Sequence, residues 1–334
     1  MSSVVQQLSS GLSPDSERTL RACPDIAGWT ENLLFTPYDP INDIGMWLHL
    51  GTVADRWETW EDRVLIALPE DQGVLTMWAY HRTVAERQPA GANLEFRCEQ
   101  PFRKWRITFD GFCLRSSYEQ MRASPLADGA KSHVRMDLEV ECVTPVWDAA
   151  TAGVGMAEQS WAREHYEQLT WVTGQLAIDG VVIDFNGGGW RDHSRGPRGA
   201  DTLKDWGGHV ITGGVLPSGR AFGMCRYWAR DGRTTLEGSY VVEEATLRQV
   251  GITSAPPPAV LARDGETYSF ALEGGQAING VVRSSMWMSM ADGLPYGVVD
   301  PVRAYTVSWA EVQWGGETGH AYLERSAMTP SLAR

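Results

Sequence analysis

The five cysteines of this 334-residue chain form no C-x-x-C pair and no metal-finger spacing. They are scattered and odd in number, which indicates reduced, mostly structural thiols. The seven histidines show no H-x-H, H-x-x-H or H-E-x-x-H spacing. The sequence therefore predicts no metal site.

Glycine motifs of nucleotide-binding proteins are also missing. The glycines at residues 187–189 and 213–214 do not stand between a strand and a helix, as a Rossmann site or a Walker loop requires. A Gly-x-Ser-x-Gly elbow is absent as well, which argues against the commonest kind of serine hydrolase. We expect no cofactor.

Positive charge and long apolar runs are scarce. Acidic residues outnumber basic ones 42 to 29, and the net charge of −13 opposes the phosphate backbone of a nucleic acid, so no such partner is expected. No apolar run approaches the roughly 18 residues needed to span a bilayer. Residues 1–20 lack the pattern of a signal peptide. These features predict a cytoplasmic protein with no membrane span.

Aromatic residues, in contrast, are abundant: the chain has 15 Trp, 10 Tyr and 8 Phe. Indole rings are large and apolar, and each carries an N–H group that needs a partner. Such a composition suits either the core of a β-rich protein or an amphipathic ligand cavity.

Short apolar or alternating segments, separated by turn residues, dominate the chain. The turns include Asp110-Gly111, Asp179-Gly180 and Asp231-Gly232, which favour tight hairpins between antiparallel strands. Helical periodicity is almost absent. The sequence therefore predicts an all-β protein with two antiparallel β-barrel or sandwich domains and few short helices.

The strand pattern is interrupted once, near the middle of the chain. We expect a flexible N-terminal arm at residues 1–29, a β domain at 30–150, a connector at 151–169 and a second β domain at 170–330. The acidic segment Trp57–Asp62 is interpreted as a solvated loop, and the alternative is that it lines a cavity.

The segment Asn186–Arg198 is the strongest functional candidate, with the sequence NGGGWRDHSRGPR. The preceding residues predict a hairpin through Asp179-Gly180 that delivers the segment to a strand end, inside the second domain. Three glycines permit close backbone approach, and Trp190 offers an apolar wall beside Asp192.

Asp192 and His193 are candidates for proton transfer. On an extended strand, neighbouring side chains point to opposite faces, so only one of the two enters a given cavity, whereas in a bend both could enter. A carboxyl group buried among aromatic rings has a raised pKa and can act as a general acid. The three nearby arginines, Arg191, Arg195 and Arg198, leave a second interpretation open, in which Asp192 is only a structural ion-pair partner.

Further candidates for ligand binding complete the predicted site. Tyr38, His49 and His81 lie in or beside predicted strands and are expected as pocket walls, although alternation alone does not decide which face is inside. The other expected ligand-binding residues are Asn186, Trp190, Arg191, Arg195 and Arg198.

The segment GWRDHSRGPR, residues 189–198, resembles the Gly-x-Arg-Asp-His-Ser-Trp-Gly-Pro-Arg signature of uncharacterised bacterial proteins related to the carotenoid 1,2-hydratase and tocopherol cyclase superfamily. Supporting similarity lies at residues 101–111 (PFRKWRITFDG), 165–168 (HYEQ), 172–174 (VTG) and 319–324 (GHAYLE). The resemblance covers roughly residues 30–326. Arg195 stands where the signature has Trp, which makes the local cavity more polar.

This resemblance implies two lipocalin-like β domains that hold a hydrophobic ligand, an architecture shared by fungal Diels–Alderases. It also implies a lyase, hydratase or isomerase that works on an isoprenoid, steroid-like or aromatic molecule without a redox cofactor, and Asp192 matches the acid that protonates a double bond. The alternatives are a non-catalytic carrier of a hydrophobic ligand and a structural β protein. A homodimer is one expected assembly, and the expected partner is a hydrophobic small molecule.

Overall fold

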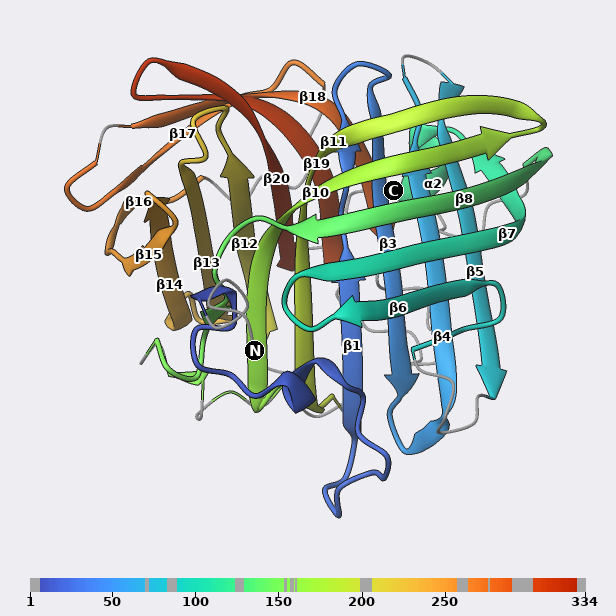
Figure 1. Ribbon diagram of the computed structural model, residues 1–334, viewed down its shortest axis with the longest axis horizontal. Coiled ribbons are helices and arrows are strands. Elements are labelled where there is room, and N and C mark those ends of the chain that lie inside the picture. The colour runs from blue at the N-terminus through green and yellow to red at the C-terminus, as the bar shows by residue number, and fades with distance from the viewer. Residues whose placement is uncertain are drawn as a thin grey trace.

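The computed structural model consists almost entirely of antiparallel strands, with 67% strand and 4% helix. It describes residues 7–69, 72–82, 89–123, 129–152, 155–156, 159, 161–198, 206–256, 264–275, 277–289 and 303–328. The strands form two large sheets, so the predicted all-β class is confirmed (Figure 1).

The first sheet holds eleven strands from the N-terminal part of the chain. Its strands are β1 (Trp29–Phe35), β2 (Tyr38–Asp39), β3 (Ile44–Val53), β4 (Arg56–Ala67), β5 (Val74–Arg82), β6 (Leu94–Gln100), β7 (Lys104–Ser116), β8 (Lys131–Cys142), β9 (Trp147–Asp148), β10 (Glu164–Ile178) and β11 (Val181–Pro197). Pairing runs β1-β3-β4-β5-β7-β8-β10-β11, and β11 pairs back with β1. This eight-strand circuit closes the sheet into a barrel, which removes exposed sheet edges.

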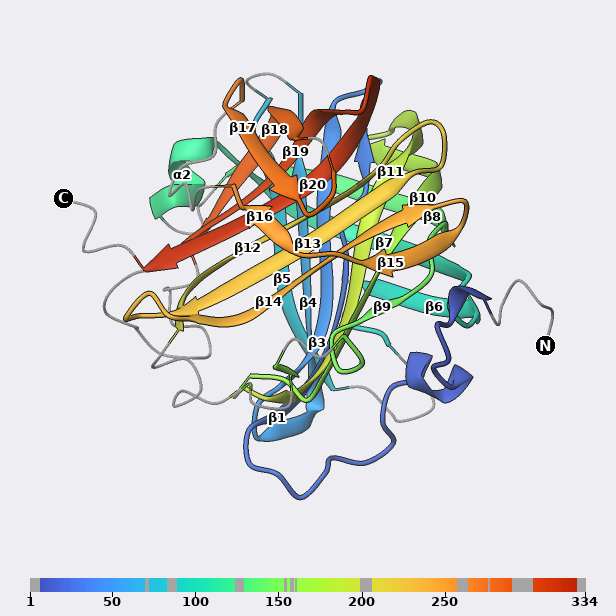
Figure 2. The ribbon, with the colours of Figure 1, turned by 90° about the vertical axis from the view of Figure 1, so that its left-hand side faces the viewer.

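The second sheet holds nine strands in the order β15-β14-β13-β12-β20-β19-β18-β17-β16. These are β12 (Trp206–Val215), β13 (Ala221–Ala229), β14 (Thr234–Glu243), β15 (Thr246–Gln249), β16 (Ile252–Ser254), β17 (Thr267–Leu272), β18 (Ile278–Ser289), β19 (Arg303–Trp314) and β20 (Glu317–Met328). Two short helices, η1 (Pro14–Glu17) and α2 (Tyr118–Ala123), complete the described elements. Figure 2 shows the second sheet in front of the first.

Three large apolar clusters follow from the alternation of side chains along the strands, beside a small one of Phe102, Val146 and Tyr166. One fills the first barrel, and includes Leu33 and Phe35. A second, with Phe222 and Phe270, covers the inner face of the second sheet. The third lies between the sheets and is rich in indole rings, so the large Trp content stabilises the contact between sheets. Leu33 and Leu34 of strand β1 point to opposite faces of the sheet. Leu33 packs in the cluster inside the barrel, and Leu34 packs in the cluster between the sheets.

Strand β11 is longer than the sequence predicts, because it includes most of the segment Asn186–Arg198. The hairpin through Asp179 and Gly180 is confirmed: both have positive φ, and Ile178 pairs with Val181 across the turn. The motif was expected at a strand end, and this is wrong. Residues 186–197 continue the 17-residue strand β11: residues 186–195 pair with β10, and residues 191–197 pair with β1, which closes the barrel.

The last strand of the first sheet ends at Pro197, and the first strand of the second sheet begins at Trp206. The change from one sheet to the other therefore comes later in the sequence than the expected connector at residues 151–169. Strands β10 and β11, expected in the second half, therefore lie in the first sheet. The domain limits themselves stay a prediction. The segment expected as a flexible arm is tied to the barrel at Glu17. This residue is buried, and its carboxylate accepts hydrogen bonds from Phe102 N and Trp105 Nε1.

The acidic segment Trp57–Asp62 is part of strand β4 and is not a solvated loop. Glu61 and Asp62 are buried. Glu61 pairs with Arg63 at 2.5 Å, and Asp62 accepts hydrogen bonds from the backbone N–H groups of residues 92–94. The charges are tolerated inside because each carboxylate has donors.

Candidate functional site

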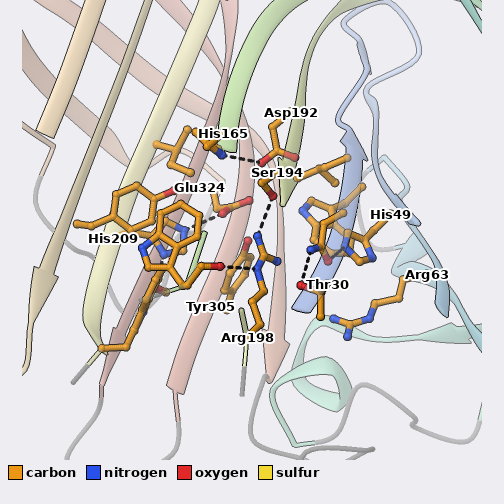
Figure 3. A pocket seen from close by; sticks show the side chains of 18 of the residues that line it. Thr30, His49, Arg63, His165, Asp192, Ser194, Arg198, His209, Tyr305 and Glu324 are labelled. Carbon is orange, nitrogen blue, oxygen red and sulfur yellow. Dashed lines mark hydrogen bonds and ion pairs between the residues drawn. The ribbon is translucent and has the colours of Figure 1, made fainter. Parts of the chain in front are cut away.

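A cavity of about 220 Å³ lies between the two sheets. Strands β1, β3, β4, β10 and β11 of the first sheet and β12, β13, β19 and β20 of the second contribute its walls. The lining residues are Thr30, Asn32, Leu34, Trp47, His49, Glu61, Arg63, Trp161, His165, Asp192, Ser194, Arg198, Trp206, His209, Ile211, Tyr227, Tyr305, Glu324 and Ser326. The walls combine aromatic rings with acid–base groups, as Figure 3 shows.

Asp192 projects into this cavity from β11. Its side chain is 14% exposed, and that surface faces the cavity. Burial raises the pKa of Asp192 to about 7, since a desolvated carboxyl group favours its neutral form; His165 and Arg198 act in the opposite direction, and Glu167 adds to the rise. The group therefore holds or releases a proton near neutral pH.

His165, on β10, is the nearest titratable partner of Asp192. Its Nδ1 lies 3.8 Å from Asp192 Oδ2, and its Nε2 lies 2.9 Å from Glu167 Oε1. Burial lowers the pKa of His165, but the hydrogen bond and charge of Glu167 outweigh it, so the net shift is upward. Trp190 Nε1 donates to the other oxygen of Glu167 at 3.2 Å, which holds the carboxylate in place.

The second sheet contributes a further hydrogen-bonded group to the opposite wall. His209 on β12 lies 2.7 Å from Glu324 Oε1 and 2.7 Å from Ser326 Oγ, both on β20. Tyr322 also donates to Glu324. The ring of His209 stacks on Tyr227, with centroids 5.3 Å apart.

Arg198 and His49 bring other polar atoms to the cavity. Arg198 Nη2 donates to Ser194 Oγ at 2.8 Å, and its Nε donates to Trp161 O at 3.4 Å. His49 stacks on Trp47 and lies 3.2 Å from Asn32 Oδ1. Burial and the positive charges of Arg63 and Arg198 lower the pKa of His49 well below its ordinary value, so this ring is neutral.

The structure does not bring His193 to the side of Asp192. His193, Arg191 and Arg195 alternate with Asp192 along β11 and point to the opposite face, toward the inside of the barrel. His193 Nε2 lies 2.8 Å from Glu31 Oε1, and its Nδ1 lies 2.6 Å from the hydroxyl of Tyr166. None of the three lines the cavity.

Those three residues belong to a buried network that secures the N-terminal segment. Arg191 Nη2 pairs with Glu17 at 2.8 Å, and Arg195 Nε pairs with Glu31 at 2.9 Å. Charge pairing keeps the pKa values of Glu17 and Glu31 low despite burial. The sequence left open that Asp192 is the ion-pair partner of the nearby arginines. In the structure, Arg191 and Arg195 pair with Glu17 and Glu31 instead.

The remaining predicted residues are dispersed. Trp190 is buried between the sheets and stacks on Tyr322, with ring centroids 5.4 Å apart. Tyr38 lines a separate hollow of about 50 Å³ beside Trp309. Asn186 and His81 are exposed, and Asn186 accepts a hydrogen bond from the indole of Trp171. Of the ten expected residues, Asp192, Arg198 and His49 line the main cavity.

Sequence reasoning assigned no role to His165, His209, Glu324 or Ser326. The sequence pattern that could have indicated these residues is a pair of polar residues two apart in a strand, because such residues lie on the same face. His165 and Glu167 form such a pair on β10, and Glu324 and Ser326 form one on β20. Only the pairing of β20 with β12 places His209 opposite Ser326.

Among the residues that the structure describes, no group of three or more His, Cys, Asp or Glu side chains is arranged to hold a metal ion. Within the same part of the chain, no helix is long and apolar enough to cross a membrane.

A family model described as a domain of unknown function, DUF7064, matches residues 14–329. The chain belongs to the DUF7064 family. No curated protein matches this DUF7064 chain by sequence.

Solved structures share the fold of this DUF7064 protein at low sequence identity. A protein described as AttH, from Nitrosomonas europaea, is 12% identical with a TM-score of 0.59, over 92% of this chain and 94% of that one. Kievitone hydratase from Nectria haematococca is 9% identical with a TM-score of 0.56, over 96% and 93%. CghA, solved with Sch210972, is 8% identical with a TM-score of 0.51, over 90% and 89%. At these identities the likeness establishes the fold of the DUF7064 chain.

Proposed function

We propose that the protein is a cofactor-independent lyase, hydratase or isomerase that acts on a hydrophobic small molecule by acid–base chemistry, with Asp192 as the proton-transfer group. The observation that carries this proposal is a carboxyl group with a pKa of about 7 inside an aromatic-walled cavity. The folds of kievitone hydratase and CghA support the same class.

Protonated Asp192 is suited to donate its proton to a carbon–carbon double bond or to a leaving hydroxyl group. A general acid works best when its pKa is near the operating pH, and Asp192 meets this condition. The aromatic rings of Trp47, Trp161 and Tyr227 around it stabilise the cation that forms on the substrate, through the negative face of each ring.

His165 assists Asp192 in proton transfer, in place of the sequence candidate His193. At 3.8 Å from Asp192, it is close enough to return a proton to the carboxylate through one water after each turnover. His193, on the other face of β11, holds Glu31 and Tyr166 and so acts as a positioning residue.

Arg198 is the residue best placed to bind a polar group of the substrate. Its guanidinium lies in the cavity beside Ser194, and arginine binds carbonyl oxygens and carboxylates strongly. Arg191 and Arg195 point away from the cavity and hold the strand in place through Glu17 and Glu31.

The size of the cavity favours a compact substrate. Its volume of about 220 Å³ is below the roughly 300–1,000 Å³ of pockets that bind drug-sized ligands. A small aromatic or cyclic molecule fits this space better than an extended isoprenoid chain. The departure of Arg195 from the signature does not make the cavity more polar, because Arg195 faces the barrel interior.

The proposal is tested first by finding the ligand. Native mass spectrometry of protein purified from its own host identifies a bound hydrophobic compound. That compound is then incubated with the protein in deuterium oxide and analysed by mass spectrometry. An enzyme of this class yields a product that carries solvent deuterium or the mass of one water, and a carrier returns the compound unchanged.

A further inference from the structure

Ser326, His209 and Glu324 form a hydrogen-bonded chain on the cavity wall that the second sheet provides. His209 Nδ1 lies 2.7 Å from Ser326 Oγ, and His209 Nε2 lies 2.7 Å from Glu324 Oε1. The chain forms because His209 and Ser326 are register partners on β12 and β20, and Glu324 shares a face with Ser326. All three are buried and line the cavity.

Glu324 determines where the proton of His209 lies. Burial would raise the pKa of Glu324, but the hydrogen bond and charge of His209 and the hydroxyl groups of Tyr305 and Tyr322 lower it below its ordinary value. The anionic carboxylate only accepts hydrogen bonds, so a neutral His209 ring carries its proton on Nε2. Its Nδ1 is then the acceptor for the hydroxyl proton of Ser326.

We propose that Ser326 is an activated nucleophile, with His209 as its base and Glu324 orienting the base, and that this centre cleaves compact, apolar carboxylic esters. A hydroxyl within hydrogen-bond reach of an imidazole that a carboxylate orients is the arrangement that performs acyl transfer on unrelated folds. The reaction is separate from proton transfer by Asp192, so each assignment stands without the other.

The proposed reaction consumes one water per ester. Ser326 Oγ attacks the carbonyl carbon as its proton moves to His209 Nδ1, and the bond to the alcohol breaks as the alcohol takes that proton. Water then attacks the acyl group on Ser326, gives a proton to His209, and releases the carboxylic acid. The proton returns to Ser326 Oγ, which restores the starting state.

The surroundings of Ser326 favour this chemistry. Trp206 Nε1 lies 3.4 Å from Ser326 Oγ, so an N–H donor stands near the place where the carbonyl oxygen of an attacked ester would gain negative charge. The rings of Trp206, Tyr227 and Tyr305 surround His209, with centroids 5.3–5.4 Å away. Apolar rings exclude water and strengthen the pairing of a protonated His209 with Glu324.

Ser194 provides an internal comparison within the same cavity. It is also buried, and its Oγ accepts a hydrogen bond from Arg198 Nη2 at 2.8 Å. A guanidinium donates and does not accept protons. Ser194 therefore lines the same cavity as Ser326 but has a partner that does not act as a base.

Phosphonylation with a small alkyl fluorophosphonate tests the proposal on the full-length protein. Attack by Ser326 Oγ forms a P–O bond, breaks the P–F bond, and releases fluoride while His209 takes the proton. Intact mass and peptide mapping should show one adduct, on Ser326 and not on Ser194. His209→Asn should slow the reaction about 100-fold or more, the usual contribution of a general base. The control Ser239→Ala, outside the cavity, should keep the wild-type rate.

Two results would overturn the proposal: the absence of an adduct on Ser326, or an adduct that forms at the same rate in His209→Asn. Ser326→Cys shows whether reagents reach the position, by its reaction with methyl methanethiosulfonate. If the thiol reacts while wild-type Ser326 stays unmodified, Ser326 is not activated. If the thiol does not react, a substrate does not reach it either, and the proposal also fails. Melting curves confirm that each variant is folded.

Discussion

Asp192 Oδ2 lies 3.8 Å from His165 Nδ1, and the pKa values of both groups are raised, that of Asp192 to about 7. A carboxyl group and an imidazole this close behave as a coupled pair, because the charge state of each changes the proton affinity of the other. The first sheet thus presents two coupled proton-binding groups to the cavity. The second sheet presents His209 and Glu324 to the same space.

Asp192→Asn should stabilise the protein at alkaline pH. The pKa of Asp192 rises from 3.8 unfolded to about 7 folded, so folding keeps a proton that the unfolded chain loses between about pH 4 and 7. Stability falls across that window in the wild type and not in the variant. At roughly 1.4 kcal/mol per pKa unit, the variant gains up to about 4 kcal/mol above pH 7. Urea unfolding at pH 5 and pH 8 measures this; an equal effect at both values would contradict the raised pKa.

Glu167→Gln should lower the pKa of His165 below its ordinary value. Without the carboxylate at 2.9 Å, burial becomes the dominant influence, and a buried imidazole favours its neutral form. Titration of labelled histidine by NMR measures the shift. Glu164→Gln is the matched control, since Glu164 pairs with Arg195 on the other face and its side chain is half exposed. A pKa of His165 that is unchanged in Glu167→Gln would show that Glu167 does not hold its proton.

Glu17→Ala should destabilise the protein strongly. Glu17 is buried and pairs with Arg191 at 2.8 Å, so its removal leaves the guanidinium without its buried carboxylate. Breaking a buried pair in this way costs about 3–5 kcal/mol. Glu58→Ala removes an exposed pair with Arg82, which contributes only about 0–1 kcal/mol. Similar unfolding free energies for the two variants would show that the N-terminal segment does not secure the barrel.

The glycines of β11 should differ sharply from one another. A Cβ at Gly187 would lie 1.8 Å from Tyr38 O, whereas a Cβ at Gly188 would meet no atom within 4 Å. Gly187→Ala therefore forces β2 and β11 apart and costs about 1–3 kcal/mol or more. Gly188→Ala should be close to neutral. Thermal unfolding of both variants measures the difference, and equal melting temperatures would mean that the close approach of β2 is not required.

The fold class was predictable because hairpin turns and strand alternation are local signals. Asp179-Gly180 fixes its hairpin through two residues with positive φ. The extent of β11 was not predictable, because three consecutive glycines are locally unfavourable in a strand. They are accommodated by pairing with β10 and by the close approach of Tyr38, which are long-range contacts.

The site was predictable only in part, for the same reason. The opposite orientation of Asp192 and His193 follows from strand alternation, but which of the two faces the cavity depends on the second sheet. Its other wall depends on the register of β12 and β20, which brings His209 to Ser326 over a separation of 117 residues. A single strand carries no signal of that pairing.

The central claim is that Asp192 transfers the proton, and solvent-label incorporation tests it most directly. Wild-type protein and Asp192→Asn are given the ligand identified by native mass spectrometry, in deuterium oxide, and the rate at which deuterium or water enters the product is measured. We predict label in the wild-type product, a rate that falls above about pH 7, and a loss of about 100-fold or more in Asp192→Asn. A folded Asp192→Asn variant that incorporates label at the wild-type rate would contradict the claim.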